Sequence, residues 1–297
     1  MSFDRRTFLK VAAAAPLASV ATPAAAASLR AAPGAKGVLV DTTLCAGCRA
    51  CEAACSEKNG LEEPASAGEP RALDHARLTS PDVFTVVNRA TRTGKDGGAR
   101  FVKTQCLHCV DPACASACPV RAMEKRSDGP VEYHAELCIG CRYCMIACPF
   151  GVHKYQYAKA VPYVRKCDFC AARQAKGQPP ACAQVCPTGA LLYGERDELL
   201  EIARTRIYQN PGTYVHHIYG ENEVGGTSWL YIGDVPPESL GLPSDVRSEP
   251  YPRLTGTALS GVPFVMTLVP PLLMGIYAFS KARAGDVAAK QREDRHE

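Results

Sequence analysis

The chain has 297 residues and a formal net charge of +4, a charge too small and too dispersed to indicate nucleic-acid binding. Its 24 glycines and 23 prolines suit a loop-rich protein. All sixteen cysteines fall into four groups of four, so none is left over as a nucleophile, and no glycine-rich nucleotide loop follows a predicted strand. These features disfavour catalysis by this chain alone.

Residues 1–27 are predicted to be a twin-arginine export signal. Arg5 and Arg6 precede a mildly apolar, alanine-rich stretch that ends in small residues at 25–27. A basic helix on a membrane surface is the alternative, which the prolines of this stretch disfavour. A signal of this kind exports folded proteins, so we expect a periplasmic protein that folds in the reducing cytoplasm before export.

Four cysteine groups lie within residues 37–195, which we expect to form one domain. The first and third groups follow C-x2-C-x2-C-x3-C, the second C-x2-C-x4-C-x3-C and the fourth C-x2-C-x11-C-x3-C. In chain order the groups are Cys45, Cys48, Cys51, Cys55; Cys106, Cys109, Cys114, Cys118; Cys138, Cys141, Cys144, Cys148; and Cys167, Cys170, Cys182, Cys186. The last three groups end in Cys-Pro.

The run C-x2-C-x2-C-x3-C-P is the ligand pattern of bacterial [4Fe–4S] ferredoxins. Three thiolates on a tight loop reach one cubane, and the fourth begins a helix that leads to a second cluster, where proline suits the first turn. Groups therefore work in pairs, and four groups predict four [4Fe–4S] clusters. Disulfides and structural zinc are the alternatives. Disulfide scaffolds are usually shorter than about 100 residues, and zinc has no use for the third and fourth cysteines.

The segments between the groups are predicted to be short hairpins and surface loops. Residues 82–106 read as a hairpin that leads into the second group. Residues 124–138 read as another hairpin, with its turn at Asp128-Gly129. Residues 62–74 are rich in Pro, Ala and Gly and predict a surface insertion.

Residues 196–253 are predicted to be an extension with a helix and a short strand. The helix ends at Asn210-Pro211-Gly212, and the strand carries the only tryptophan, Trp229. A small satellite core is the favoured place for this tryptophan, and partner docking is the alternative.

Residues 254–280 are uncharged and long enough to cross a bilayer, which takes about 20 residues. Three prolines within them predict kinks, and a buried soluble helix is the alternative. Lys281 and Arg283 place the tail, residues 281–297, in the cytoplasm, in agreement with an exported N-terminal domain. The span contains no histidine to hold haem b, so we expect an integral-membrane partner.

The order and spacing of the four groups resemble those of the four-cluster iron–sulfur subunits of membrane-bound periplasmic oxidoreductases, such as the beta subunit of respiratory formate dehydrogenase. The export signal, the tail helix and the stretch "YGENEVGGTSWLYIGDVPPESLGLP" make the chain most similar to the iron–sulfur subunit of hydrogenase-2-type nickel–iron hydrogenases. The resemblance implies an α+β, loop-rich fold of two bacterial-ferredoxin-like (βαβ-type, two-cluster) units, one nested in the other, with a C-terminal single transmembrane helix.

The resemblance also implies how the groups share clusters: the outer groups pair, and the inner groups pair. The implied ligand sets are set 1, Cys45, Cys48, Cys51 and Cys186; set 2, Cys55, Cys167, Cys170 and Cys182; set 3, Cys106, Cys109, Cys114 and Cys148; and set 4, Cys118, Cys138, Cys141 and Cys144. Spacing alone leaves sequential pairing equally open, because 19 and 18 residues separate groups two and three and groups three and four.

The implied role is non-catalytic electron transfer. The donor would be a periplasmic catalytic subunit, with a hydrogenase favoured and formate dehydrogenase or a sulfur-compound reductase as alternatives. The acceptor would be an integral-membrane quinone- or cytochrome b-type subunit, and the anchor opposes a free polyferredoxin shuttle.

Several charged residues flank the ligands. They either tune the clusters or are plain solvated charges, and they are Arg49, Arg142, Arg165 and Lys166. His108 lies between two cysteines of a complete group, so we expect it at the surface or behind the ligands rather than as a ligand.

Overall fold

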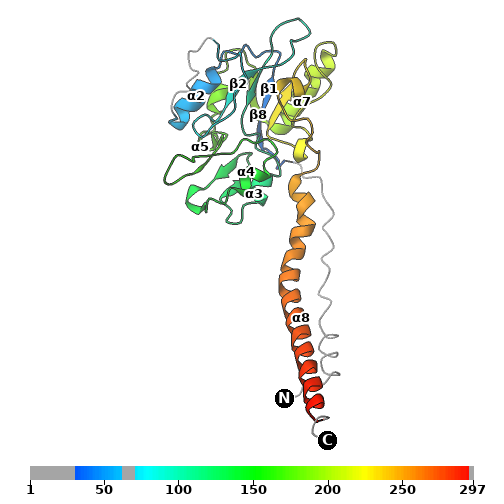
Figure 1. The fold of residues 1–297 in the computed structure, drawn as a ribbon. Coiled ribbons are helices and arrows are strands. Elements are labelled where there is room, and N and C mark those ends of the chain that lie inside the picture. The colour runs from blue at the N-terminus through cyan, green and yellow to red at the C-terminus, as the bar shows by residue number, and fades with distance from the viewer. Residues whose placement is uncertain (1–30, 62–70, 294–297) are drawn as a thin grey trace. The chain divides into compact units, whose positions relative to one another are not determined.

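The computed structural model describes residues 31–61 and 71–293 (Figure 1). The predicted export signal, with Arg5 and Arg6, lies outside the described residues. The described part is a mixture of short helices and strands with one long C-terminal helix, as the expected α+β class requires.

A three-stranded sheet supports the region. Strand β1 (Lys36–Asp41) lies between β8 (Leu191–Glu195), which is antiparallel to it, and β9 (Trp229–Ile232), which is parallel. The β1 sequence KGVLVD has an apolar run that suits a strand covered on both faces. Helix α7 (Arg196–Gln209) follows β8 directly, as predicted, and Asn210 caps its C-terminal end.

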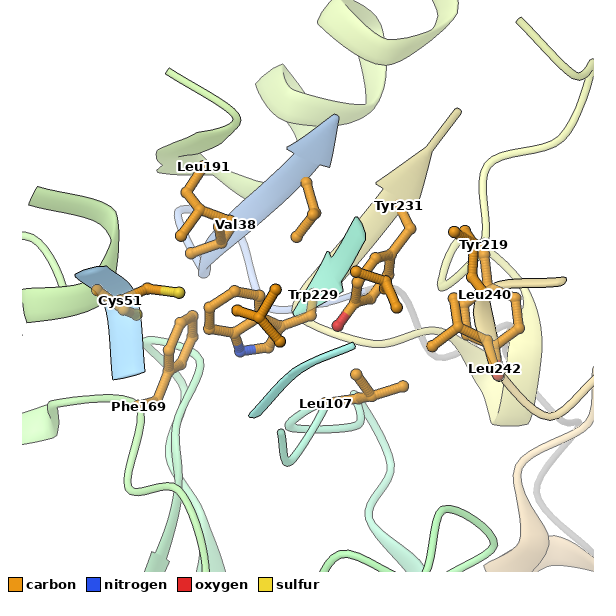
Figure 2. Close-up of a cluster of buried hydrophobic side chains, with 14 of the residues drawn as sticks. Val38, Cys51, Leu107, Phe169, Leu191, Tyr219, Trp229, Tyr231, Leu240 and Leu242 are labelled. Atoms are coloured by element: carbon orange, nitrogen blue, oxygen red, sulfur yellow. The ribbon is translucent and has the colours of Figure 1, made fainter. Parts of the chain in front are cut away.

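The two faces of the sheet have different partners, because side chains alternate along a strand. Leu39, Leu230 and Ile232 pack with apolar residues of α7. Val38 and Trp229 point the other way, into a core that also contains cysteines (Figure 2). The sheet therefore has α7 on one face and the core that contains cysteines on the other.

The predictions for Trp229 were wrong. Its side chain is fully buried in the main core, beside Phe169, with ring centroids 5.7 Å apart (Figure 2). It therefore belongs neither to a satellite core nor to a docking surface. The reason is the parallel pairing of β9 with β1, which joins residues 196–253 to the sheet of the cysteine region.

Both predicted hairpins are present. Strands β2 (Val86–Arg89) and β3 (Phe101–Thr104) are antiparallel, and so are β4 (Met123–Lys125) and β5 (Val131–Tyr133). Gly129, in the second turn, has φ of +126°, a conformation that glycine adopts without steric cost. A third pair, β6 (Lys154–Tyr155) and β7 (Val164–Arg165), was not predicted.

The remaining helical segments are short. They are α2 (Ala50–Asn59), α3 (Ala113–Ser116), η1 (Ala135–Leu137), α4 (Tyr143–Ala147), α5 (Ala171–Gln174), α6 (Ala181–Gln184), η2 (Glu223–Gly225) and η3 (Pro237–Leu240). Most of the predicted insertion, 62–70, lies outside the described residues. Its end is not at the surface, because Ala72 is fully buried and Leu73 packs against the main core.

Helix α8 (Tyr251–Glu293) is longer than the predicted span and runs through all three prolines. Its segment Gly261–Gly285 has a mean hydropathy of 1.8, which is apolar enough for 25 residues to cross a membrane. None of its most apolar stretch is buried against the rest of the described chain. A buried core helix, which was the alternative, would instead pack most of this stretch against the rest of the protein.

Candidate iron–sulfur centres

The first and third cysteine groups have the same local backbone. In each, glycine and then arginine take the left-handed conformation just before a helix: Gly47 and Arg49 before α2, and Gly140 and Arg142 before α4. A left-handed arginine costs about 1–3 kcal/mol, and such residues cluster at functional sites. A Cβ atom on Gly47 would lie 2.8 Å from the ring of Phe101. Both loops are therefore held in one strained shape that presents thiols to a common centre.

All sixteen cysteines lie in the described part of the chain, and every one is a free thiol there. Two cavities collect them in fours. One cavity is lined by all four cysteines of set 1, from the first and fourth groups, together with Lys103. The other is lined by all four cysteines of set 4, from the second and third groups, together with Arg142.

The cysteines of set 2 also lie close to one another. Burial, together with the charges of Cys182 and Cys170, raises the pKa of the Cys55 thiol to about 12 against the opposing effect of Lys103. Burial likewise raises the pKa of Cys167, with Cys55 adding to the rise. These residues come from the first and fourth groups, so the structure brings the set together.

The cysteines of set 3 also lie close to one another. Burial raises the pKa of the Cys109 thiol well above its ordinary value, and the other three members of the set raise it further. Burial also raises the pKa of Cys148, and the nearby backbone N–H groups of Val152, Phe150 and Gly151 oppose that rise. N–H donors on sulfur are a usual feature of cluster loops and help to set the reduction potential.

The four sets follow one another in a row. After burial, Cys182 of set 2 contributes to the raised pKa of Cys51 in set 1. Cys106 of set 3 acts on Cys167 of set 2, and Cys144 of set 4 acts on Cys114 of set 3. Each set therefore has a neighbour, in the order 1, 2, 3, 4. Only the end sets contain an exposed cysteine, Cys48 in set 1 and Cys141 in set 4.

The donor set fits [4Fe–4S] clusters. Burial raises the pKa of Cys51, Cys55 and Cys114 to about 12, so bare thiolates at these places would be costly at neutral pH. Bound iron keeps a thiolate deprotonated. Within the described residues, the indole N–H of Trp229 is buried without a hydrogen-bond partner, and so are both ring nitrogens of His153, one of which carries a hydrogen in the neutral ring. Cluster sulfides can accept a hydrogen bond from each of these two N–H groups.

The charged residues beside the cysteine ligands differ in burial and in their partners. Lys166 is buried, and its Nζ atom donates to the carbonyl oxygens of Val131 and Cys167, so it is not a solvated charge. Arg142 lies over the ring of Tyr155. These contacts leave a tuning role as a prediction.

The remaining two arginines of the prediction lie near other side chains. The Arg49 Nε atom is 3.4 Å from a Glu52 carboxylate oxygen, and Arg165 lies over the ring of Phe84. Arg49 also lines the cavity of set 1.

His108 is not at the surface. Its side chain is fully buried, and its Nδ1 atom accepts a hydrogen bond of 2.9 Å from the backbone N–H of Val131. The surface alternative was therefore wrong, because the second hairpin covers the ring.

Two lysines near the cysteine groups were missed. Lys103 is 2% exposed in the middle of β3. Lys125 is half-buried in β4; burial lowers its pKa to about 8, and the charges of Cys109 and Cys106 oppose that fall. The sequence does carry a signal, since each lysine interrupts a predicted strand close to a cysteine group.

Buried thiols gathered in fours around such loops define an iron–sulfur protein of the ferredoxin class. The model of the 4Fe-4S dicluster domain family matches residues 98–196. The hydrogenase-2 operon protein HybA of Escherichia coli O157:H7 is 38% identical over 275 residues, which cover 81% of this chain and 84% of HybA. The iron–sulfur subunit of nitrate-inducible formate dehydrogenase from E. coli K12 is 36% identical over 218 residues, 70% of this chain and 72% of that subunit.

A protein of Nitratidesulfovibrio vulgaris is 47% identical over 298 residues, 98% of this chain and 80% of its own length. The chain therefore belongs to the family of iron–sulfur subunits that includes HybA and the formate dehydrogenase subunits. It is an iron–sulfur electron-transfer protein, and its cofactors are [4Fe–4S] clusters.

Proposed function

We propose that the chain relays electrons between a periplasmic catalytic subunit, with a hydrogenase preferred, and a quinone-reducing partner in the membrane, without catalysing a reaction itself. The observation that carries the proposal is the row of four cysteine sets with an exposed cysteine at each end. Each [4Fe–4S] cluster supplies one-electron chemistry when bound.

A hydrogenase is preferred because similarity to the hydrogenase-2 operon protein extends over 81% of the chain, against 70% for the formate dehydrogenase subunit. The larger share of the chain matched by the hydrogenase-2 operon protein favours a hydrogenase as the donor. A molybdopterin enzyme such as formate dehydrogenase, or a sulfur-compound reductase, is the second candidate for the donor.

We further propose the nested ligand sets, in which sets 1 and 2 form one two-cluster unit and sets 3 and 4 form the inner unit. The two four-cysteine cavities support this arrangement, because each draws its members from groups that nested pairing joins. Sequential pairing would put Cys186 with the third group, whereas Cys186 lines the cavity of Cys45, Cys48 and Cys51.

The position of α8 supports an orientation of the row of cysteine sets relative to the membrane. Helix α3, which carries Cys114 of set 3, contacts α8. Asp111, just before α3, lies close enough to Arg253 in the first turn of α8 for the arginine to lower its pKa against the larger effect of burial. We therefore place sets 3 and 4 in the half nearer the membrane and sets 1 and 2 in the half that faces the catalytic subunit.

The proposed domain organisation follows the sequence predictions. Residues 1–27 are the export signal, 37–195 hold the clusters, 196–253 complete the sheet, 254–280 anchor the chain and 281–297 are cytoplasmic. The apolar exposed surface of α8 supports the anchor. Lys281 and Arg283 after the span support a location of the cluster domain on the periplasmic side of the inner membrane.

The test is to purify the chain with its natural partners from membranes. We expect about sixteen irons and as much acid-labile sulfide per chain. We also expect a nickel–iron subunit in the preparation, and cluster signals that appear when dihydrogen is added. Stoichiometric zinc without sulfur-to-iron charge-transfer absorbance would refute the iron–sulfur function. A molybdopterin partner with formate-dependent reduction would refute the hydrogenase and leave electron transfer intact.

A further inference from the structure

Lys103 is a buried cation between two of the cysteine sets. It lies in β3 opposite Val87 of β2, and its side chain lines the cavity of set 1. Its charge also lowers the pKa of Cys55 and Cys167, which belong to set 2. One ammonium group thus acts on both sets of the outer unit.

The position of the ammonium group is fixed by its neighbours. Its Nζ atom donates a hydrogen bond of 2.8 Å to Gln105 Oε1 and lies 4.5 Å from the centroid of the Trp229 ring. Gln105 Nε2 in turn donates to the Tyr231 hydroxyl at 2.8 Å, and that hydroxyl donates to the Lys103 carbonyl oxygen at 3.0 Å. Both aromatic residues, labelled in Figure 2, come from β9, which pairs with the central strand β1. The lysine therefore cannot swing out to water without breaking this closed network.

The charge of Lys103 has no carboxylate partner: across residues 31–61 and 71–293, no Asp or Glu forms an ion pair with it. A lone buried ammonium is very costly, and a lysine so placed ordinarily loses its proton. Iron keeps the thiolates of sets 1 and 2 deprotonated when their clusters are bound, and this negative charge lies beside the ammonium group. The negative charge that compensates Lys103 is therefore that of the two ligand sets.

We propose that Lys103 is a fixed positive charge shared by sets 1 and 2, which raises the reduction potentials of both clusters that these sets hold. The inference rests on the proposed function. Reduction adds one negative charge to a cluster, and a nearby cation in a poorly polarisable surrounding stabilises the reduced form more than the oxidised form. Because Lys103 faces both sets, it shifts both potentials in the same direction. The difference between the two potentials therefore stays largely unchanged.

The test is an EPR-monitored redox titration of the purified complex, with iron and sulfide measured in the same samples. Lys103→Met removes the charge and keeps an unbranched apolar chain. Lys36→Met is the matched control, since Lys36 is a part-exposed lysine at the start of β1 that pairs with Glu195 of β8. We expect Lys103→Met to lower two of the four midpoint potentials. The expected change is at least tenfold in the reduction equilibrium, or about 59 mV for a one-electron couple. Lys36→Met should leave all four near their original values.

Equal shifts in both variants, or no shift in Lys103→Met with all clusters present, would overturn the role of Lys103 and leave the electron-transfer function standing. If Lys103→Met loses clusters, Lys103→Arg decides the question, because it retains the charge. Full iron content with unchanged potentials in Lys103→Arg supports the proposal, and lowered potentials there overturn it. A wild-type complex without iron would instead overturn the proposed function.

Discussion

The ring of His108 stacks on the ring of Phe169, with 4.9 Å between the ring centroids and 24° between the planes. His108 belongs to the second cysteine group and Phe169 to the fourth, so the contact joins the loops of sets 3 and 2. These are the middle sets of the row, and no other pair of loops links the outer unit to the inner one in this way among the ring contacts of the described residues.

Phe169→Ala should weaken this junction. Phe169 is 1% exposed and also packs beside Trp229. Removing a buried phenylalanine side chain costs about 3–5 kcal/mol. We expect a lower thermal midpoint, measured by loss of the cluster absorbance together with circular dichroism. Tyr208→Ala, which truncates a side chain that is 85% exposed, is the control and should change neither signal. Equal stability of the two variants would contradict the packing described for Phe169.

Cys186→Ser should damage the same cluster as Cys45→Ser, because both cysteines line one cavity. Under sequential pairing, the two variants would damage clusters in different halves of the protein. Spectroscopy that resolves the four clusters compares the two proteins directly. Cys141→Ser serves as the control for set 4 and should remove a different signal. Loss of different clusters in the first two variants would show that the groups are not nested.

Asp234→Asn should destabilise the connection between the first hairpin and the segment after β9. Asp234 accepts bonds of 2.9 and 2.8 Å from Arg100 and one of 2.9 Å from the backbone of Lys95. Breaking a buried ion pair costs up to about 3–5 kcal/mol, and Asp96, which also pairs with Arg100, compensates part of that cost. Chemical denaturation at pH 7 measures the difference. Asp96→Asn, at an exposed carboxylate, is the control and should have little effect.

The stability difference between wild type and Asp234→Asn should depend on pH. Burial acts to raise the pKa of Asp234, but the bonds from Arg100 and Lys95 outweigh burial and hold the pKa below its ordinary value of 3.8. The stabilisation is therefore fully present above pH 3.8 and is lost as the pH falls through the lower folded-state pKa. The stability difference between wild type and Asp234→Asn should stay constant from pH 7 to about pH 5 and shrink below pH 4. A difference that grows in acid would contradict this sign.

Replacing Arg5 and Arg6 with lysines should leave a cluster-loaded protein in the cytoplasm. Lysine keeps the positive charge but loses the guanidinium geometry that a twin-arginine signal requires. Protease accessibility of residues 37–253 in spheroplasts, together with iron content, checks the result. If the lysine variant still reaches the periplasm, the signal has been misread. If it stays inside without iron, cluster insertion does not precede export.

Much of the site chemistry can be predicted from local sequence. The spacing of Cys138, Cys141 and Cys144 keeps three thiols within one loop and the first turn of α4, since the distances involved span only a few residues. The same locality explains why the hairpins at 82–106 and 124–138 and the helix after β8 were predicted correctly. Turn residues and alternation act over short stretches, and the folded chain did not override them.

Only the tertiary structure decided which cysteines share a cavity, that Trp229 is in the main core and that Lys103 is buried between two ligand sets. Each depends on segments that are far apart in the chain. Cys186 reaches Cys45 because β8 pairs with β1, and Lys103 is covered by Trp229 because β9 pairs with the other edge of β1. Spacing in a sequence carries no information on such pairings, since a loop of any moderate length can close either arrangement at similar entropic cost. Burial of the shared apolar core selects one of them.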